Sequence, residues 1–302
     1  MKMLPFLILS FLFLACNKPK PKDDRLKVLA TTNIVADLIS RIGGNEIALR
    51  HLMGPGVDPH LYKASEGDVL KLYEADIIFY GGLHLEGKLT DVFAKLKDKR
   101  HMVALGDSLP KNQLLESSNF GGSYDPHVWF DVDLVKEMCS VITKELIAIR
   151  PEQAAFFREN NMAFQKELSA LKAELIEKVN EIPEEKRILV TAHDAFGYFG
   201  KSFGFKVVGL QGISTATEAG VKDVRALADF IVTHEIKSIF VENSVPRRMI
   251  EALQAAVKAR GFEVSIGGEL FSDTLGNKNS SEGTYIGMYT YNVNTIVNGL
   301  KE

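Results

Sequence analysis

The stretch PEQAAFFRENNMAFQKELSALKAELIEKVNE, Pro151 to Glu181, lies in the middle of a 302-residue chain and decides how that chain is divided. Its apolar residues recur three or four positions apart, which is the spacing of one face of an amphipathic helix. It contains no glycine and, after Pro151, no proline, and Pro183 follows as a helix stop. The pattern predicts one linking helix over residues 151–182, about 45 Å long at a rise of about 1.5 Å per residue. The apolar positions are Phe157, Phe164, Leu168, Leu171, Leu175 and Val179.

Short apolar segments alternate with amphipathic ones on both sides of this helix. Such alternation of strands and helices is typical of a doubly wound parallel sheet. We therefore predict an α/β protein of two doubly wound lobes joined by the single long helix, with lobes over residues 27–150 and 183–302. Asn33 should cap the first helix. The predicted strands cover residues 27–32, 46–53, 76–82, 101–106, 187–193, 206–210, 237–243 and 262–268.

The N-terminus carries the pattern of an export signal. Lys2 precedes the apolar run LPFLILSFLFLA, which is too short to span a bilayer but suits the apolar region of a signal peptide. Cys16 follows at once, and the polar, proline-spaced residues 16–26 predict a flexible tether. We interpret residues 1–15 as a lipoprotein signal peptide and Cys16 as the lipid attachment site of an extracytoplasmic protein. An ordinary secretory signal is the alternative.

The composition excludes other classes of function. The chain has 36 Lys and Arg against 39 Asp and Glu, so we expect no basic surface field and no nucleic-acid partner. Only two cysteines occur, Cys16 and Cys139, too few for a disulfide framework or a zinc site built from thiolates.

Asp-Pro-His occurs twice, in GVDPHLY and SYDPHVWFD, at His60 and His127. Each copy alone is consistent with a turn, but two copies followed by apolar residues favour histidines held at a shared site. His193 and Asp273 also lie near predicted strand ends, and ligands of open α/β sheets bind at the carboxyl ends of strands. Three imidazoles and one carboxylate suit Zn²⁺ and are acceptable to Mn²⁺. We therefore predict a four-ligand metal site.

Four further residues are candidates for the surroundings of that site. Asp125 and Asp194 adjoin predicted ligands and could orient imidazole rings, as metal-bound histidines usually require; capping and turn roles are the alternative. Glu242 ends a predicted strand and is a candidate for the cleft. His84 also follows a strand, and we place it in the site or at its rim.

Seven motifs together resemble the metal-binding solute receptors of bacterial zinc and manganese ABC importers, the TroA/ZnuA group. The resemblance runs from about Lys27 to the C-terminus. It implies two lobes joined by a rigid helix, a metal buried in the cleft between them, and His60, His127, His193 and Asp273 as ligands. It also implies a monomer that captures one Zn²⁺ or Mn²⁺ ion per chain and delivers it to a membrane permease. The motifs are DPHLY, GLHLE, DPHVWFD, TAHDAFGYF, GLQGIST, FVENSVP and GGELFSDTLG.

Two other classes of function stay open as alternatives. A zinc-dependent hydrolase needs an open position on the metal and a general base, whereas protein fills all four predicted positions and no HExxH motif occurs. We therefore expect no enzyme. A surface adhesin is supported by no feature of the sequence.

The resemblance leaves the choice of metal open. Manganese-selective members commonly have Glu at the position of His193, whereas many zinc-specific members carry a long loop rich in His and acidic residues. The segment between Gly82 and Pro126 has no such loop. We also expect metal release to need only local opening, in the loops of His193 and Asp273, because one long helix resists bending.

Overall fold

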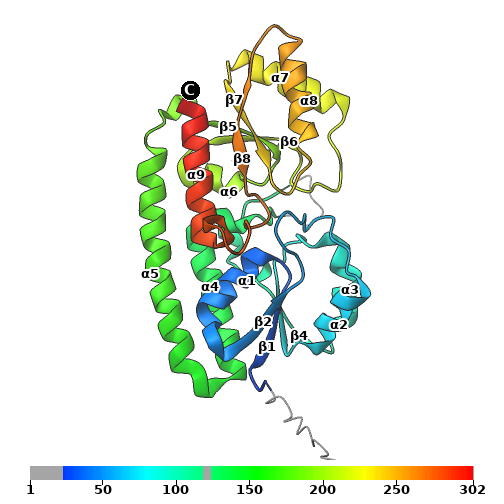
Figure 1. Ribbon diagram of the computed structural model, residues 1–302, viewed down its shortest axis with the longest axis vertical. Helices are drawn as coiled ribbons and strands as arrows, with labels where there is room; N and C mark the ends of the chain where they lie inside the picture. Colours follow the sequence, from blue (N-terminus) through cyan, green and yellow to red (C-terminus); the bar gives the residue numbers. More distant parts are fainter. Residues whose placement is uncertain (1–22, 118–123, 302) are drawn as a thin grey trace, which may run out of the picture.

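The computed structural model describes residues 23–117 and 124–301. The chain forms two α/β lobes. Three helices pack along one side of the pair (Figure 1): α4 (Val132–Ile149), α5 (Ala154–Val179) and α9 (Tyr285–Lys301). The predicted fold class is therefore confirmed. The predicted signal peptide, Cys16 and most of the tether lie outside the described residues. Within the described part of the chain, no helix combines the length and the apolar character that crossing a membrane requires.

The N-terminal lobe contains a four-stranded parallel sheet in the order β2-β1-β3-β4. Its strands are β1 (Leu26–Ala30), β2 (Ile47–His51), β3 (Ile77–Tyr80) and β4 (His101–Ala104). Its helices are α1 (Asn33–Gly43), α2 (Glu66–Glu74), α3 (Thr90–Leu96) and α4 (Val132–Ile149). The four strands match those predicted from the apolar segments, with ends shifted by no more than two residues.

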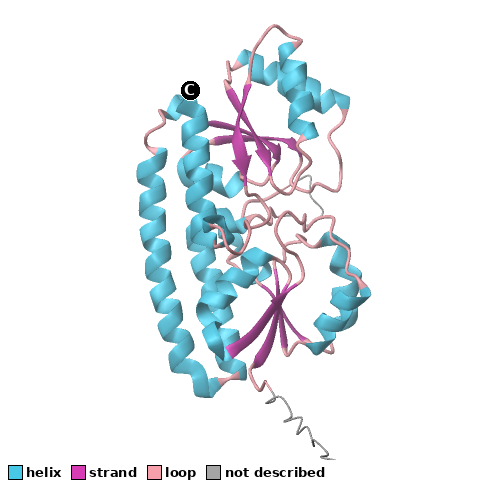
Figure 2. Cartoon of the chain, viewed as in Figure 1, coloured by secondary structure: helices cyan, strands magenta, loops and turns pink. Residues whose placement is uncertain are grey.

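The C-terminal lobe also has parallel strands, which hydrogen-bond in two pairs. Parallel β5 and β6 pair with each other, as do β7 and β8, and β5 lies beside β7. Figure 2 shows the strands of both lobes running toward the middle of the molecule, so their carboxyl ends face each other there. The strands are β5 (Ile188–His193), β6 (Lys206–Gln211), β7 (Ser238–Glu242) and β8 (Ser265–Leu270). The helices are α6 (Gly197–Phe203), α7 (Val221–Thr233), α8 (Arg248–Lys258) and α9 (Tyr285–Lys301).

The long helix predicted from the sequence is α5 (Ala154–Val179), which packs against α1, α4 and α9. It is shorter than predicted because Pro151 opens a 3₁₀ turn, Pro151–Gln153, before the α-helix begins. Its 26 residues still give a length of about 39 Å. The six apolar positions chosen from the spacing are its buried residues.

The expected N-cap of α1 is wrong by one residue. Thr32, in an extended conformation, caps the helix, and its hydroxyl accepts a hydrogen bond of 3.2 Å from the backbone of Val35. Asn33 is thereby free to bond across to the C-terminal lobe. Its side chain donates to the carbonyl of Leu275 at 3.3 Å and accepts from the Leu275 amide at 3.0 Å.

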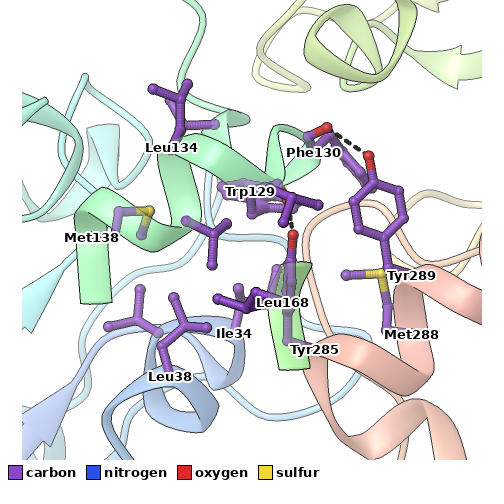
Figure 3. Close-up of a cluster of buried hydrophobic side chains, with 14 of the residues drawn as sticks. Ile34, Leu38, Trp129, Phe130, Leu134, Met138, Leu168, Tyr285, Met288 and Tyr289 are labelled. Atoms are coloured by element: carbon purple, nitrogen blue, oxygen red, sulfur yellow. Dashed lines mark hydrogen bonds between the residues drawn. The ribbon is translucent and has the colours of Figure 1, made fainter. Parts of the chain in front are cut away.

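An apolar cluster joins the two lobes beside α4 and α9, and residues of both lobes belong to it (Figure 3). At its centre the hydroxyl of Tyr285 donates to the carbonyl of Trp129 at 2.8 Å, and that of Tyr289 to the carbonyl of Phe130 at 2.6 Å. All four side chains are buried. These contacts fix the segment that directly follows His127.

Candidate metal centre

Four side chains from four separate segments meet where the lobes face each other. His60 lies in the loop after β2, and His127 directly precedes the 3₁₀ turn Val128–Phe130. His193 is the last residue of β5, and Asp273 follows the end of β8. They are between 0 and 2 % exposed. The structure thus brings together all four residues that the sequence suggested as ligands.

The spacing of these side chains suits a metal ion. Nε2 of His127 lies 3.3 Å from Nε2 of His60 and 3.4 Å from Oδ1 of Asp273. Nε2 of His193 lies 3.4 Å from Oδ2 of Asp273, and one potential ligand atom from each of the four lies within 4.8 Å of the others. A tetrahedral zinc ion with bonds of about 2.0–2.1 Å needs its ligands about 3.3 Å apart. Three of these separations match that value, and Nε2 of His60 lies somewhat farther, 4.0 Å, from Oδ2 of Asp273.

Two carboxylates hold the outer nitrogens of two of these rings. Oδ1 of Asp125 accepts from Nδ1 of His127 at 2.7 Å and from its backbone amide at 2.9 Å. Oε2 of Glu242 lies 2.5 Å from Nδ1 of His193, and Oε1 accepts from the His193 amide at 2.8 Å. Because Nδ1 is engaged, Nε2 of each ring is turned toward the shared centre.

The electrostatics of the cluster favour a cation. Burial opposes protonation of His127, but Asp125 and Asp273 outweigh it and raise the pKa of this imidazole to about 9. Burial is likewise outweighed at His193, whose pKa is raised well above its usual value by carboxylates. The pKa of Asp273 is held well below its usual value by both histidines, despite burial, whereas burial lowers the pKa of His60 to about 3. A divalent cation would replace the bound protons.

The other three predictions around the site have different outcomes. Glu242 does not face an open cleft; it is buried behind His193. Asp194 lines a groove that also contains Gln211 and Ser214, and burial followed by the charge of Asp125 raises its pKa. His84 is exposed in a left-handed conformation (φ 67°) and lies in a groove of the N-terminal lobe. Asp194 and His84 are outside the four-residue cluster.

Asp58 is a further residue beside the site that was not predicted from the sequence. Its Oδ1 accepts from the backbone amide of His60 at 2.8 Å, as Oδ1 of Asp125 does from that of His127. The signal was present, because both aspartates begin an Asp-Pro-His motif. The prediction covers the carboxylate of the second copy, Asp125, and not that of the first.

Comparison with known proteins identifies the family of the chain. The family model described as "Zinc-uptake complex component A periplasmic", ZnuA, matches residues 28–299. Manganese-binding lipoprotein MntA of Bacillus subtilis is 45 % identical over 282 residues, covering 93 % of this chain and 92 % of the relative. Zinc-binding protein TroA of Treponema pallidum is 45 % identical over 284 residues, covering 94 % and 92 %.

A solved structure supports the fold directly. The periplasmic zinc-binding protein TroA from Treponema pallidum superposes with a TM-score of 0.89 at 46 % identity, covering 91 % of this chain and 99 % of that one. The match includes both lobes. The chain therefore belongs to the ZnuA family of metal-binding, substrate-binding proteins of ABC importers, whose members are not enzymes.

Proposed function

We propose that this protein captures one Zn²⁺ or Mn²⁺ ion outside the cytoplasm with His60, His127, His193 and Asp273. It then delivers the ion to the membrane permease of an ABC importer. The observation that carries the proposal is the convergence of three imidazoles and one carboxylate, all buried, at distances that suit tetrahedral coordination. A metal held by four protein ligands has no open position for an activated water, which suits transport and not hydrolysis.

We include both zinc and manganese as candidate ions because the relatives differ in the metal that they are named for. One relative at 45 % identity is named for manganese and another at 45 % for zinc. Three nitrogen donors favour zinc, whereas the carboxylate suits either ion. We also propose a division of the chain into lobes at residues 27–150 and 183–302, with residues 151–182 linking them.

The direct test is calorimetric titration of the metal-free protein with zinc and, separately, with manganese. We expect one equivalent of either ion to bind, with release of protons because the protonated imidazoles must give up theirs. The proposal would be contradicted if the titration curves of zinc and of manganese both failed to saturate near one equivalent.

Replacing His193 by Glu should shift the preference from zinc toward manganese. Glutamate supplies one or two oxygens in place of one nitrogen, which allows the higher coordination number that manganese accepts. Zinc still stands above manganese in the general order of affinity, so what should fall is the ratio of the affinity for zinc to the affinity for manganese. Competition titrations of both metals on parent and variant measure that ratio.

His193→Ala is the matched control, because it removes the nitrogen and supplies no oxygen. It should weaken binding of both metals more than His193→Glu does. An unchanged or larger zinc preference in His193→Glu would show that His193 does not select the metal by its donor atom.

We further propose that residues 1–15 are removed and that Cys16 becomes a lipidated N-terminus, with residues 16–26 as the tether of a monomeric receptor. The short apolar run directly before Ala15 and Cys16 supports this. Mass spectrometry of the protein extracted from membranes should find the mature chain starting at Cys16 with an acyl mass. Cys16→Ala should release the protein from membranes. An unmodified chain that starts elsewhere would refute the lipid anchor.

A further inference from the structure

The loop that carries His60 is attached to both lobes. At one end the backbone amide of Met53 donates to the carbonyl of Thr31 at 2.9 Å, and at the other the Tyr62 hydroxyl donates to Asp68 at 2.7 Å; both partners are in the N-terminal lobe. Between these anchors the loop contacts the C-terminal lobe. His60 itself is buried, while the Leu61 side chain beside it is 47 % exposed.

Asp58 makes the first contact across the lobes. Its Oδ2 accepts a hydrogen bond of 2.5 Å from the hydroxyl of Thr215, which lies between β6 and α7. Its Oδ1 accepts from the amide of His60 at 2.8 Å. One carboxylate therefore joins the backbone of a proposed ligand to the opposite lobe.

Thr274 makes the second contact. Its hydroxyl oxygen accepts from the amide of Gly56 at 3.0 Å and from the side chain of Asn243 at 2.7 Å. Gly56 has a φ of +72°, which a side chain would strain, so the turn that presents this amide depends on glycine. Thr274 also directly follows Asp273, so this contact joins the segments of two proposed ligands.

The opposite wall of the site is held differently. Asn33 pairs twice with the backbone of Leu275, and the indole of Trp129 donates to the carbonyl of Ser272 at 2.8 Å. These residues adjoin the apolar cluster of Figure 3, which contains Trp129 and Leu275. Separating the two lobes at this wall would expose a large apolar surface. Separating the His60 loop from the C-terminal lobe only breaks hydrogen bonds that water can replace.

We propose that Asp58 is a positioning residue which, with Thr215 and Thr274, forms a latch across the lobes. The latch holds His60 against the bound metal and slows metal release. Release begins when the latch opens and His60 withdraws, while His127 and Asp273 stay in place. This inference rests on the proposed function, because it assumes that the cluster binds metal.

The site of opening proposed here differs from the one predicted from the sequence. We expected the loops of His193 and Asp273 to open when the metal is released. In the structure, His193 ends a strand and is backed by Glu242, and the Asp273 segment is bonded to the wall described above. The contacts favour the His60 loop instead.

The test is the rate at which zinc leaves the full chain, measured by stopped flow with an excess of a colorimetric chelator. Thr215→Val removes the hydroxyl and keeps the shape of the side chain. We expect it to raise the dissociation rate at least about tenfold, the lower limit for loss of one hydrogen bond to a charged group. The association rate should change little, and Thr215→Ser should restore the parent rate.

Thr217→Val is the matched control, because Thr217 lies exposed on the same loop. It should release zinc at the parent rate. Asp58→Ala and Thr215→Val should be non-additive in a double-mutant cycle, because each removes the same contact. Thr274→Val tests the second contact independently and should also speed release.

The outcomes separate the two proposals. If the parent chain binds no zinc, the proposed function fails and the latch fails with it. If the parent binds one equivalent but Thr215→Val and Thr274→Val both release zinc at the parent rate, the function stands and the latch is overturned. Equal acceleration by Thr217→Val would also overturn it.

Discussion

Asp273→Ala should lower the affinity for zinc at least about a hundredfold, since loss of groups that only orient a ligand already costs about 10- to 100-fold. Asp273 is the one carboxylate in the proposed set of ligands, and its oxygens lie 3.4 Å from Nε2 of both His127 and His193. It is fully buried, so water cannot take its place without reorganisation of the site. Removing it also leaves the divalent cation with neutral donors only.

Asp194→Ala is the control for this variant. Asp194 is a nearby aspartate that lines the adjoining groove and lies outside the cluster. Competition with a chelator of known affinity should give near-parental binding for Asp194→Ala. Parental affinity in Asp273→Ala would remove Asp273 from the ligand set.

Glu242→Gln should lower zinc affinity about 10- to 100-fold, the range found when carboxylates behind metal-bound histidines are replaced. The amide is nearly the same size but carries no charge, so it no longer favours a proton on Nδ1 of His193. Nε2 then becomes a weaker donor to the metal. Asp125→Asn should act in the same way through His127.

Glu269→Gln provides the comparison, because Glu269 is an exposed residue near the end of the neighbouring strand β8. The zinc affinity of Glu269→Gln should equal that of the parent protein. Zinc titrations of Glu242→Gln, Asp125→Asn and Glu269→Gln in one buffer measure these differences in affinity. If Glu242→Gln binds zinc as tightly as Glu269→Gln does, the carboxylate does not tune His193.

The parts of the fold that could be predicted depend on local pattern. The six buried positions of α5 follow from its helical spacing alone. The positions of His60, His193 and Asp273 were predictable because these residues follow strands and parallel strands present their carboxyl ends at one edge of each sheet, whereas His127 was indicated by its repeated Asp-Pro-His motif. Both inferences need no knowledge of contacts between distant residues.

The parts that could not be predicted depend on contacts between the lobes. Asn33 looked like a helix cap because that role is local, but its partner is Leu275, 242 residues away. Asp58 looked like a turn residue, and its bond to Thr215 spans 157 positions. Glu242 ends its strand as predicted, yet which way its side chain turns is set by His193 on the neighbouring strand. No spacing in the sequence encodes these pairings.

The most direct test of the proposed metal site is an anomalous difference map from crystals grown with one equivalent of zinc, measured on both sides of the zinc absorption edge. We predict one peak per chain, bounded by His60, His127, His193 and Asp273. A principal peak elsewhere, for example in the groove beside His84, or no ordered peak at full zinc loading, would contradict the account.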